Sequence, residues 1–254
     1  MKTLVWNYRG LGNPTSVQVL VDLIHLKKPD IVILIETLVG QRKLEPIKRR
    51  IGFDGLLVVE SRGHSGGLAC LWRVSPLVEI KSYSDRHIDV FVVEGDGKTK
   101  WRVTGFYGEP DRGRRHIGWN LLKELSMQHN LPWVVVGEFN DIMHEDEKRC
   151  GNPQPRWLMN GFREAVEESG LTNFNFEGHQ FTWEKSRGKS GWIQAKLDRI
   201  LVSDAWRDLF RGAIATSIIT SRSDHMSLLI QTESPSFSQS MRRFKFENLW
   251  LKEG

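Results

Sequence analysis

Two cysteines are all that the 254-residue chain contains, which is too few for a disulfide framework. Secreted domains often depend on such frameworks, so Cys70 and Cys150 favour a reducing, intracellular environment. Apolar runs are short, and none approaches the roughly 20 residues of a transmembrane helix, so we expect no membrane association. The first residues turn polar at Asn7, too early for a secretory signal, and none is expected. Internal repeats and low-complexity tracts are also lacking.

The chain also lacks a strong excess of either charge, but its small basic excess is clustered. The formal net charge is +5, which suits a polyanionic partner without requiring one. Lysine and arginine gather in four places: Arg42 and Lys43 with residues 48–50; Arg112, Arg114 and Arg115; Lys185, Arg187 and Lys189; and Arg242, Arg243 and Lys245. Taken alone, each cluster is explained most simply as a solvated face. The second and third carry more weight because they follow Tyr107 and precede Asp198, two candidate site residues.

Length and patterning favour one large domain of mixed α and β structure. Apolar runs predict strands at 4–8, 31–35, 101–107 and 133–136, and glycine-separated runs between 55 and 94 predict antiparallel hairpins. Periodic apolar residues predict helices within 15–24, 43–51, 116–129 and 156–169, the first capped by Thr15 or Ser16. This mixture indicates an α/β (α+β) fold with two mixed sheets packed together and covered by helices. We expect the domain at residues 1–233, followed at 234–254 by a linker and the start of another element.

Polar side chains stand at the ends of these predicted strands. Sheets project functional groups from strand ends, where a rigid scaffold holds them in place. The residues are, in chain order, Asn7, Glu36, Tyr107, Glu138 with Asn140, Asp198, and Asp224 with His225. Gathered in one place, these side chains would hold a divalent cation beside a scissile phosphate.

Hydrolysis of a phosphodiester needs an activated water and neutralised charge on the phosphoryl oxygens. Mg²⁺ supplies that charge, and it takes hard oxygen ligands from one or two carboxylates while keeping several waters. We assign Glu36 as the metal ligand, with Asn7 as its amide neighbour and Asp224 as a second or water-mediated ligand. Mn²⁺ is a substitute ion for such a site. The alternative for Glu36 is a helix cap or a surface acid.

Six short motifs follow one another along the chain: W-N at Trp6, E-T at Glu36, Y-G-x-P at Tyr107, G-E-F-N at Gly137, L-D-R at Leu197 and S-D-H at Ser223. Each is weak alone, but in this order they resemble the endonuclease/exonuclease/phosphatase superfamily, from the first residues to Gln231. The segments 6–12 and 181–183 look closest to its branch in plant LINE-type (non-LTR) retrotransposons. The resemblance implies a four-layer α/β/β/α sandwich.

The same resemblance implies an activity and partners. It implies a Mg²⁺-dependent endonuclease of retrotransposon type that nicks DNA and leaves a 3′-hydroxyl. DNA is then the partner, together with a fused or associated reverse transcriptase, and the nucleus is favoured over the cytoplasm. A small-molecule phosphatase of the same superfamily is a further hypothesis, which the basic clusters disfavour.

Residue roles are carried over motif by motif. Asp198 would orient the imidazole of His225, which would touch the scissile phosphate or polarise the water. Tyr107 would donate its hydroxyl to a phosphate oxygen, unless it is only an aromatic packing residue. Asn140 would fix a phosphate oxygen, and Ser223 is either a phosphate contact or a turn cap.

Glu138 departs from the family pattern, which has Asp at this position to orient or deprotonate the attacking water. The extra methylene moves the carboxylate by about an ångström, and a displacement of that size can cost on the order of 10²-fold in rate. The charge is kept, so Glu138 could also adapt by a bent rotamer. A second hypothesis is therefore a catalytically weakened pseudo-nuclease that binds nucleic acid.

A basic, glycine-containing segment at 185–192 is predicted to be a hairpin tip beside the site. In related retrotransposon nucleases a hairpin at this place reaches toward the DNA. The predicted DNA-binding residues are Arg112, Arg114, Lys185, Arg187, Lys189 and Trp192. The alternative for the segment is a surface turn kept soluble by its charges. The remaining histidines, including His64, His87 and His179, lack the spacing of a metal cage and are predicted at the surface or in loops.

Overall fold

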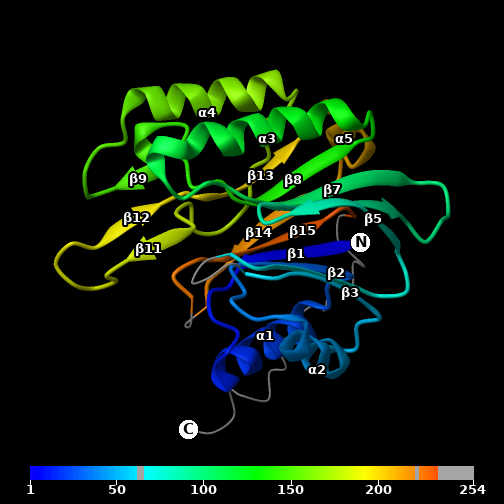
Figure 1. The fold of residues 1–254 in the computed structure, drawn as a ribbon. Coiled ribbons are helices and arrows are strands. Elements are labelled where there is room, and N and C mark those ends of the chain that lie inside the picture. The colour runs from blue at the N-terminus through cyan, green and yellow to red at the C-terminus, as the bar shows by residue number, and fades with distance from the viewer. Residues whose placement is uncertain (62–65, 221–222, 234–254) are drawn as a thin grey trace, which may run out of the picture.

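A computed structural model describes residues 1–61, 66–220 and 223–233. The predicted linker and following element at 234–254 lie outside the described residues, as do His64 and the basic cluster at 242–245. Within the described residues, two six-stranded sheets pack face to face, and helices cover their outer faces (Figure 1).

The first sheet is built mainly from the N-terminal part of the chain and closed by its last two strands. Its spatial order is β14 (Ile214–Ile218), β15 (Ser227–Gln231), β1 (Lys2–Asn7), β2 (Ile31–Ile35), β4 (Leu68–Trp72) and β3 (Gly55–Val59). Strands β1 and β2 are parallel, and the other neighbouring pairs are antiparallel. Its helices, α1 (Pro14–Lys27) and α2 (Gln41–Ile51), pack on the outer face through an apolar cluster that includes Leu20, Ile24 and Leu44.

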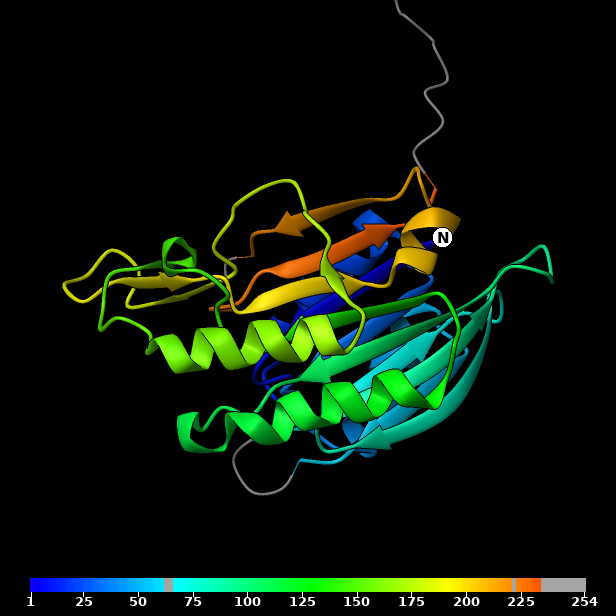
Figure 2. The same cartoon turned by 90° about the horizontal axis from the view of Figure 1, so that it is seen from above.

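The second sheet repeats this plan with later segments. Its spatial order is β10 (Thr172–Asn173), β13 (Asp198–Val202), β8 (Trp133–Glu138), β7 (Lys100–Tyr107), β6 (His87–Val93) and β5 (Leu77–Ser84). Helices α3 (Arg115–Gln128) and α4 (Arg156–Glu168) lie side by side over its outer face (Figure 2). A short α5 (Asp204–Leu209) follows β13.

The three largest apolar clusters among the described residues hold the layers together. One lies between the sheets and contains inward-facing residues of both, such as Ile33 and Val136, while the other two lie under the helix pairs. The predicted four-layer sandwich of two mixed sheets covered by helices is therefore confirmed. No helix among the described residues has the length and apolar composition needed to cross a membrane.

Two local predictions were wrong. The cap of α1 is Asn13, whose side chain accepts a hydrogen bond from the Thr15 amide, because Pro14 already occupies the first turn. His87 is buried in β6 at 6% exposure, where its two ring nitrogens meet the hydroxyls of Ser82 and Ser84.

A third, smaller sheet projects from one end of the sandwich. It pairs β11 (Trp183–Lys185) with β12 (Ile193–Ala195) and β12 with β9 (Lys148–Arg149), and Figure 1 shows it extending beyond the edge of the main sheets. The short helical turns η1 (Arg112–Arg114) and η2 (Glu145–Glu147) precede α3 and β9. The hairpin predicted around 185–192 is present, whereas β9 was not predicted.

The parallel pairs decide where the functional side chains meet. Strand β1 runs parallel to β2 in one sheet, and β7 parallel to β8 in the other. Contacts of Asn7 with Glu138 and of Tyr107 with Glu36 show that the carboxyl ends of all four strands lie at the same end of the sandwich. Gly137 lets β7 and β8 approach there: its φ is 149°, and a Cβ would stand 2.1 Å from the carbonyl oxygen of Phe106.

Candidate active site

A hydrogen-bonded network joins the ends of the two sheets. The Asn7 amide nitrogen donates to Glu138 Oε2 at 2.5 Å and, more weakly, to Glu36 Oε2 at 3.4 Å. The Tyr107 hydroxyl donates to Glu36 Oε1 at 2.5 Å. Asn7 and Glu36 come from the first sheet, and Tyr107 and Glu138 from the second. Residues up to 131 positions apart thus form one polar centre.

An aspartate–histidine pair completes this centre. His225 Nδ1 lies 2.8 Å from Asp198 Oδ2, and both side chains are buried. Asp198 is opposite Glu138 in the β13–β8 register, and its backbone amide donates to the Thr182 hydroxyl at 2.8 Å. The predicted pairing of Asp198 with His225 is present. Ser223 caps the turn that leads to His225, since its hydroxyl accepts from the His225 amide at 3.0 Å and donates to the Asn7 carbonyl at 3.1 Å.

The Glu138 carboxylate lies between Asn7 and the Asp198–His225 pair. Its Oε1 lies 3.8 Å from His225 Nε2, while its Oε2 is held by Asn7. Burial raises the pKa of Glu138 to about 7; the charge of His225 opposes this, and the carboxylates of Asp198 and Glu36 add to it. A carboxyl with a pKa near 7 is suited to accept and release a proton at neutral pH.

The surrounding carboxylates favour an imidazolium at position 225. Burial alone would lower the pKa of His225, but Asp198 and Glu138 outweigh burial and raise the pKa to about 10. Burial and the hydrogen bond to Glu36 raise the pKa of Tyr107, so its hydroxyl keeps its proton as a donor. The centre therefore contains a cationic ring and a neutral phenol that can both contact an anionic phosphate.

Two site residues have left-handed backbone conformations that non-glycine residues rarely adopt. Glu36 has a φ of 54° and Asn140 a φ of 61°. Such conformations cluster at functional sites, where the surrounding structure imposes them. At Asn140 the side-chain nitrogen donates to the Gly108 carbonyl at 3.2 Å, and the Arg115 guanidinium donates to the Asn140 carbonyl.

The oxygens near Glu36 fit a hard divalent cation. Asn7 Oδ1 is buried and has no hydrogen-bond partner among the described residues, and it belongs to the same amide that touches both Glu36 and Glu138. One carboxylate, one amide oxygen and several waters suffice for Mg²⁺. No group of three or more His, Cys, Asp or Glu side chains with metal-site geometry is found in the part of the chain that the structure describes. Asp224 is exposed, and its Oδ2 accepts from the Trp183 indole at 3.2 Å.

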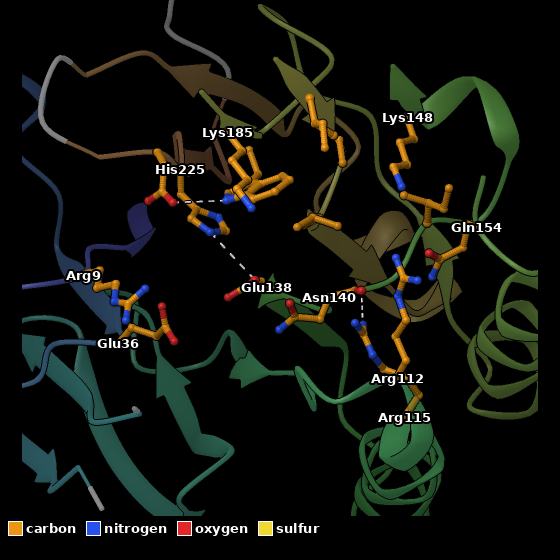
Figure 3. Close-up of a pocket in the computed structure, with 16 residues that line it drawn as sticks. Arg9, Glu36, Arg112, Arg115, Glu138, Asn140, Lys148, Gln154, Lys185 and His225 are labelled. Atoms are coloured by element: carbon orange, nitrogen blue, oxygen red, sulfur yellow. Dashed lines mark hydrogen bonds and ion pairs between the residues drawn. The ribbon is translucent and has the colours of Figure 1, made fainter. Parts of the chain in front are cut away.

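An open cleft of about 390 Å³ contains this centre. In Figure 3, Arg9 and Glu36 lie on one side, Arg112, Lys148 and Gln154 on the other, and Glu138 and Asn140 between them. Sequence reasoning missed several of the lining residues: Arg9, Arg115, Ile142, Lys148, Gln154, Trp183, Ile193, Ala195 and Leu197. Four of these had a nearby signal: Arg9 lies in the quoted 6–12 segment, Arg115 in the second basic cluster, Trp183 in the 181–183 segment, and Leu197 next to Asp198.

The predicted DNA-binding residues divide into two groups. Arg112 and Lys185 line the cleft. Four others lie outside its lining: Arg114, Arg187, Lys189 and Trp192. Arg187 pairs with Glu184 at 2.7 Å, and the Trp192 indole donates to the same Glu184 at 3.0 Å. The hairpin tip is therefore ordered around Glu184, beside the cleft rather than in it.

The family model for the endonuclease/exonuclease/phosphatase family matches residues 4–225, and the chain belongs to this family. Its name describes nucleases and phosphatases, which are hydrolases of phosphate esters, and its members typically depend on a divalent metal ion. The superfamily resemblance in the six motifs is thereby confirmed. No curated protein matches the chain.

Solved structures with the same fold include several nucleases. A 3′-5′ exonuclease (NExo) from Neisseria meningitidis aligns with a TM-score of 0.67 at 19% identity, covering 92% of this chain and 100% of that one. An AP endonuclease from Archaeoglobus fulgidus aligns at 0.66 and 19% identity, covering 91% and 98%. The endonuclease domain of TRAS1, a telomere-specific non-LTR retrotransposon, aligns at 0.62 and 14% identity, covering 91% and 97%.

Proposed function

We propose that the chain is a Mg²⁺-dependent endonuclease of retrotransposon type that nicks DNA. The observation that carries the proposal is the convergence of Asn7, Glu36, Glu138, Asp198 and His225 on one cleft. The cleft is also lined by arginine and lysine side chains, which favours a polyanionic substrate over a small phosphate ester.

Each side chain has a defined task in this proposal. Glu138 accepts a proton from the attacking water, for which its raised pKa suits it. His225, held by Asp198 as an imidazolium, donates to a non-bridging oxygen of the scissile phosphate and stabilises the charge that develops there. Tyr107 and Asn140 orient the phosphate from the second sheet.

Glu36 and the free oxygen of Asn7 are the groups that would hold Mg²⁺, with Asp224 contributing through water. When bound, the ion supplies Lewis acidity and positive charge for the phosphoryl oxygens. Mn²⁺ is expected to substitute, because it accepts the same oxygen ligands. The Asn7 amide nitrogen donates to both Glu36 and Glu138 and so fixes their positions relative to each other.

The second candidate is a weakened nuclease that binds nucleic acid without rapid turnover. A specific observation favours it: the longer side chain of Glu138 fills the space between Asn7 and His225, with one oxygen at 2.5 Å and the other at 3.8 Å. A shorter acid would leave more room there for water. Binding and cleavage must therefore be measured separately.

The test is nicking of supercoiled plasmid with and without Mg²⁺, using wild type, Glu36→Ala and His225→Ala. We expect Mg²⁺-dependent nicking by wild type and its loss in both variants, with circular dichroism unchanged. If either variant nicked the plasmid at the wild-type rate, the role assigned to the replaced residue would be excluded. Binding without nicking by wild type would support the weakened nuclease instead. Localisation in the nucleus and association with a reverse transcriptase belong to the same proposal and need cell-based tests.

A further inference from the structure

Three side chains gather at the end of the cleft that lies across from Glu36. Arg112 comes from η1, Lys148 from β9 and Gln154 from the loop before α4, and Figure 3 shows them close together on that side. None of the catalytic roles above uses Lys148 or Gln154. The group combines two cations with one amide that can donate as well as accept.

The two cations are close to each other (Figure 3). Among the described residues, neither Arg112 nor Lys148 forms an ion pair with an acid, and Lys148 donates to the Asn152 carbonyl. Burial and the charge of Arg112 lower the pKa of Lys148. Like charges held together destabilise the protein unless an anion enters between them.

The backbone around the cluster is held in place by other contacts. Glu147, next to Lys148, pairs with both terminal guanidinium nitrogens of the fully buried Arg199. Its carboxylate also accepts from the Met143 amide at 2.6 Å. Strand β9 pairs with β12, which places Lys148 opposite Ala195. The cluster is thus positioned before any ligand arrives, which reduces the entropic cost of binding one.

Two apolar side chains line one wall of the cleft between this cluster and the catalytic centre. The chain runs from Ala195, the partner of Lys148, through Leu197 to Asp198, the partner of Glu138. Ala195 and Leu197 line the cleft and have no side-chain donors for a phosphate. Arg115, which also lines the cleft, is engaged by Asp141 and the Asn140 carbonyl. Two distinct phosphate positions are therefore expected.

We infer that Arg112, Lys148 and Gln154 form a second phosphate-binding subsite, for a phosphodiester group of the substrate other than the scissile one. The inference rests on the proposed function and specifies which part of the substrate the protein needs. Three extended residues span at most about 10 Å. A nucleic acid strand advances about 3.4 Å per nucleotide, so the second phosphate lies within about three nucleotides of the cut.

The test replaces single phosphates by neutral methylphosphonates in a duplex that carries a nick site mapped on plasmid. Binding is measured by fluorescence anisotropy in EDTA for wild type, Lys148→Gln and Arg149→Gln. Arg149 is the matched control, because it has the same charge on the same strand but points to the opposite face and lies outside the cleft lining.

We expect one substituted position within about three nucleotides of the cut to weaken binding by wild type about tenfold, the value of one charge-assisted hydrogen bond. The same substitution should weaken Arg149→Gln equally and weaken Lys148→Gln clearly less, because Arg112 and Gln154 remain to contact that phosphate. If Lys148→Gln loses as much affinity as wild type at every position, the subsite is overturned while the proposed nuclease stands. If wild type neither binds nor nicks the DNA, the proposed function fails and the subsite fails with it.

Discussion

The carboxylate of Glu138 has partners from both halves of the molecule. Asn7 reaches it from the first sheet, and His225 approaches it from the turn before β15. Each partner favours the ionised carboxylate, whereas burial favours the protonated one, and the result is a pKa of about 7. The pKa of this one residue is therefore raised above its ordinary value, which suits the proposed role of Glu138 as a general base.

Asp198 should act through His225 rather than by touching the substrate. Replacing Asp198 by Asn keeps the shape but removes the charge that holds the ring as an imidazolium. We expect the Asp198→Asn nicking rate to fall by about 10²-fold or more, as for other orienting carboxylates. A rate within twofold or so of wild type, with the fold intact by circular dichroism, would contradict this role.

Asp141 predicts a pH dependence of stability that is separate from catalysis. Its carboxylate accepts from the Trp119 indole at 2.9 Å and lies 3.4 Å from Arg115, yet burial raises its pKa from 3.8 to about 6. Because the folded pKa is above the unfolded one, the stabilising contribution is complete below the unfolded pKa of 3.8 and is lost as pH rises through about 6. The loss is about 3 kcal/mol at most.

Urea unfolding of wild type and Asp141→Asn at about pH 4 and about pH 7 measures this contribution. An asparagine oxygen can still accept from Trp119, but it does not titrate. We expect the stability of wild type relative to the variant to decrease by about 2–3 kcal/mol between the two pH values. A constant difference would show that the Asp141 carboxyl has an ordinary pKa in the folded protein.

At the scale of elements, the position of the short strand β9 is stabilised mainly by a buried ion pair beside it. It has two residues, Lys148 and Arg149, and the adjacent Glu147 anchors it to Arg199, whose side chain is 0% exposed. Removing the carboxylate would leave that guanidinium buried and unpaired. We expect Glu147→Ala to lose about 3 kcal/mol of unfolding free energy in urea.

Glu145→Ala is the matched control, since it removes the same charge from an exposed position in the same η2 turn. It should change the stability by no more than about 0.5 kcal/mol. Equal losses in the two variants would mean that net charge, not the Arg199 pair, explains the effect.

We expect the basic side chains of the β11–β12 hairpin to contribute to DNA binding. Lys185 lines the cleft, and Arg187 and Lys189 lie toward the tip. Replacing all three by Ala should weaken DNA binding and reduce the salt dependence by up to about three units of slope. Fluorescence anisotropy over a salt series measures the slope. An unchanged slope would place the DNA elsewhere on the surface.

At the scale of the whole molecule, sequence predicted the parts of the site that are tied to strands. Asn7, Glu36 and Tyr107 each end or follow an apolar run, and a run of this kind identifies a buried strand without knowledge of its neighbours. Asp198 and His225 were also predicted, through motifs whose order matches the family. The fold followed from the same runs, together with the resemblance.

The other half of the cleft could not be predicted, because tertiary contacts create it. Lys148 enters the site only because a two-residue strand pairs with β12, and two residues are too few for a periodic signal. Arg115 begins α3 and appears in the sequence as one of three clustered arginines, yet it is the buried one that contacts the Asn140 carbonyl. The observed cap, Asn13, lies two or three residues before the expected Thr15 or Ser16, which is a common error for helix boundaries.

The central claim is that this cleft hydrolyses phosphodiesters in the presence of Mg²⁺, with Glu138 as the residue that limits the rate. The most direct measurement is the initial rate of supercoiled plasmid nicking by wild type and Glu138→Asp, each with Mg²⁺ and with EDTA. The account predicts Mg²⁺-dependent nicking by wild type and a rate at least about tenfold higher for Glu138→Asp, because the shorter acid leaves room for the attacking water. An absence of nicking by both proteins would contradict the account, and an equal or lower rate for Glu138→Asp would show that the site is already adapted to glutamate.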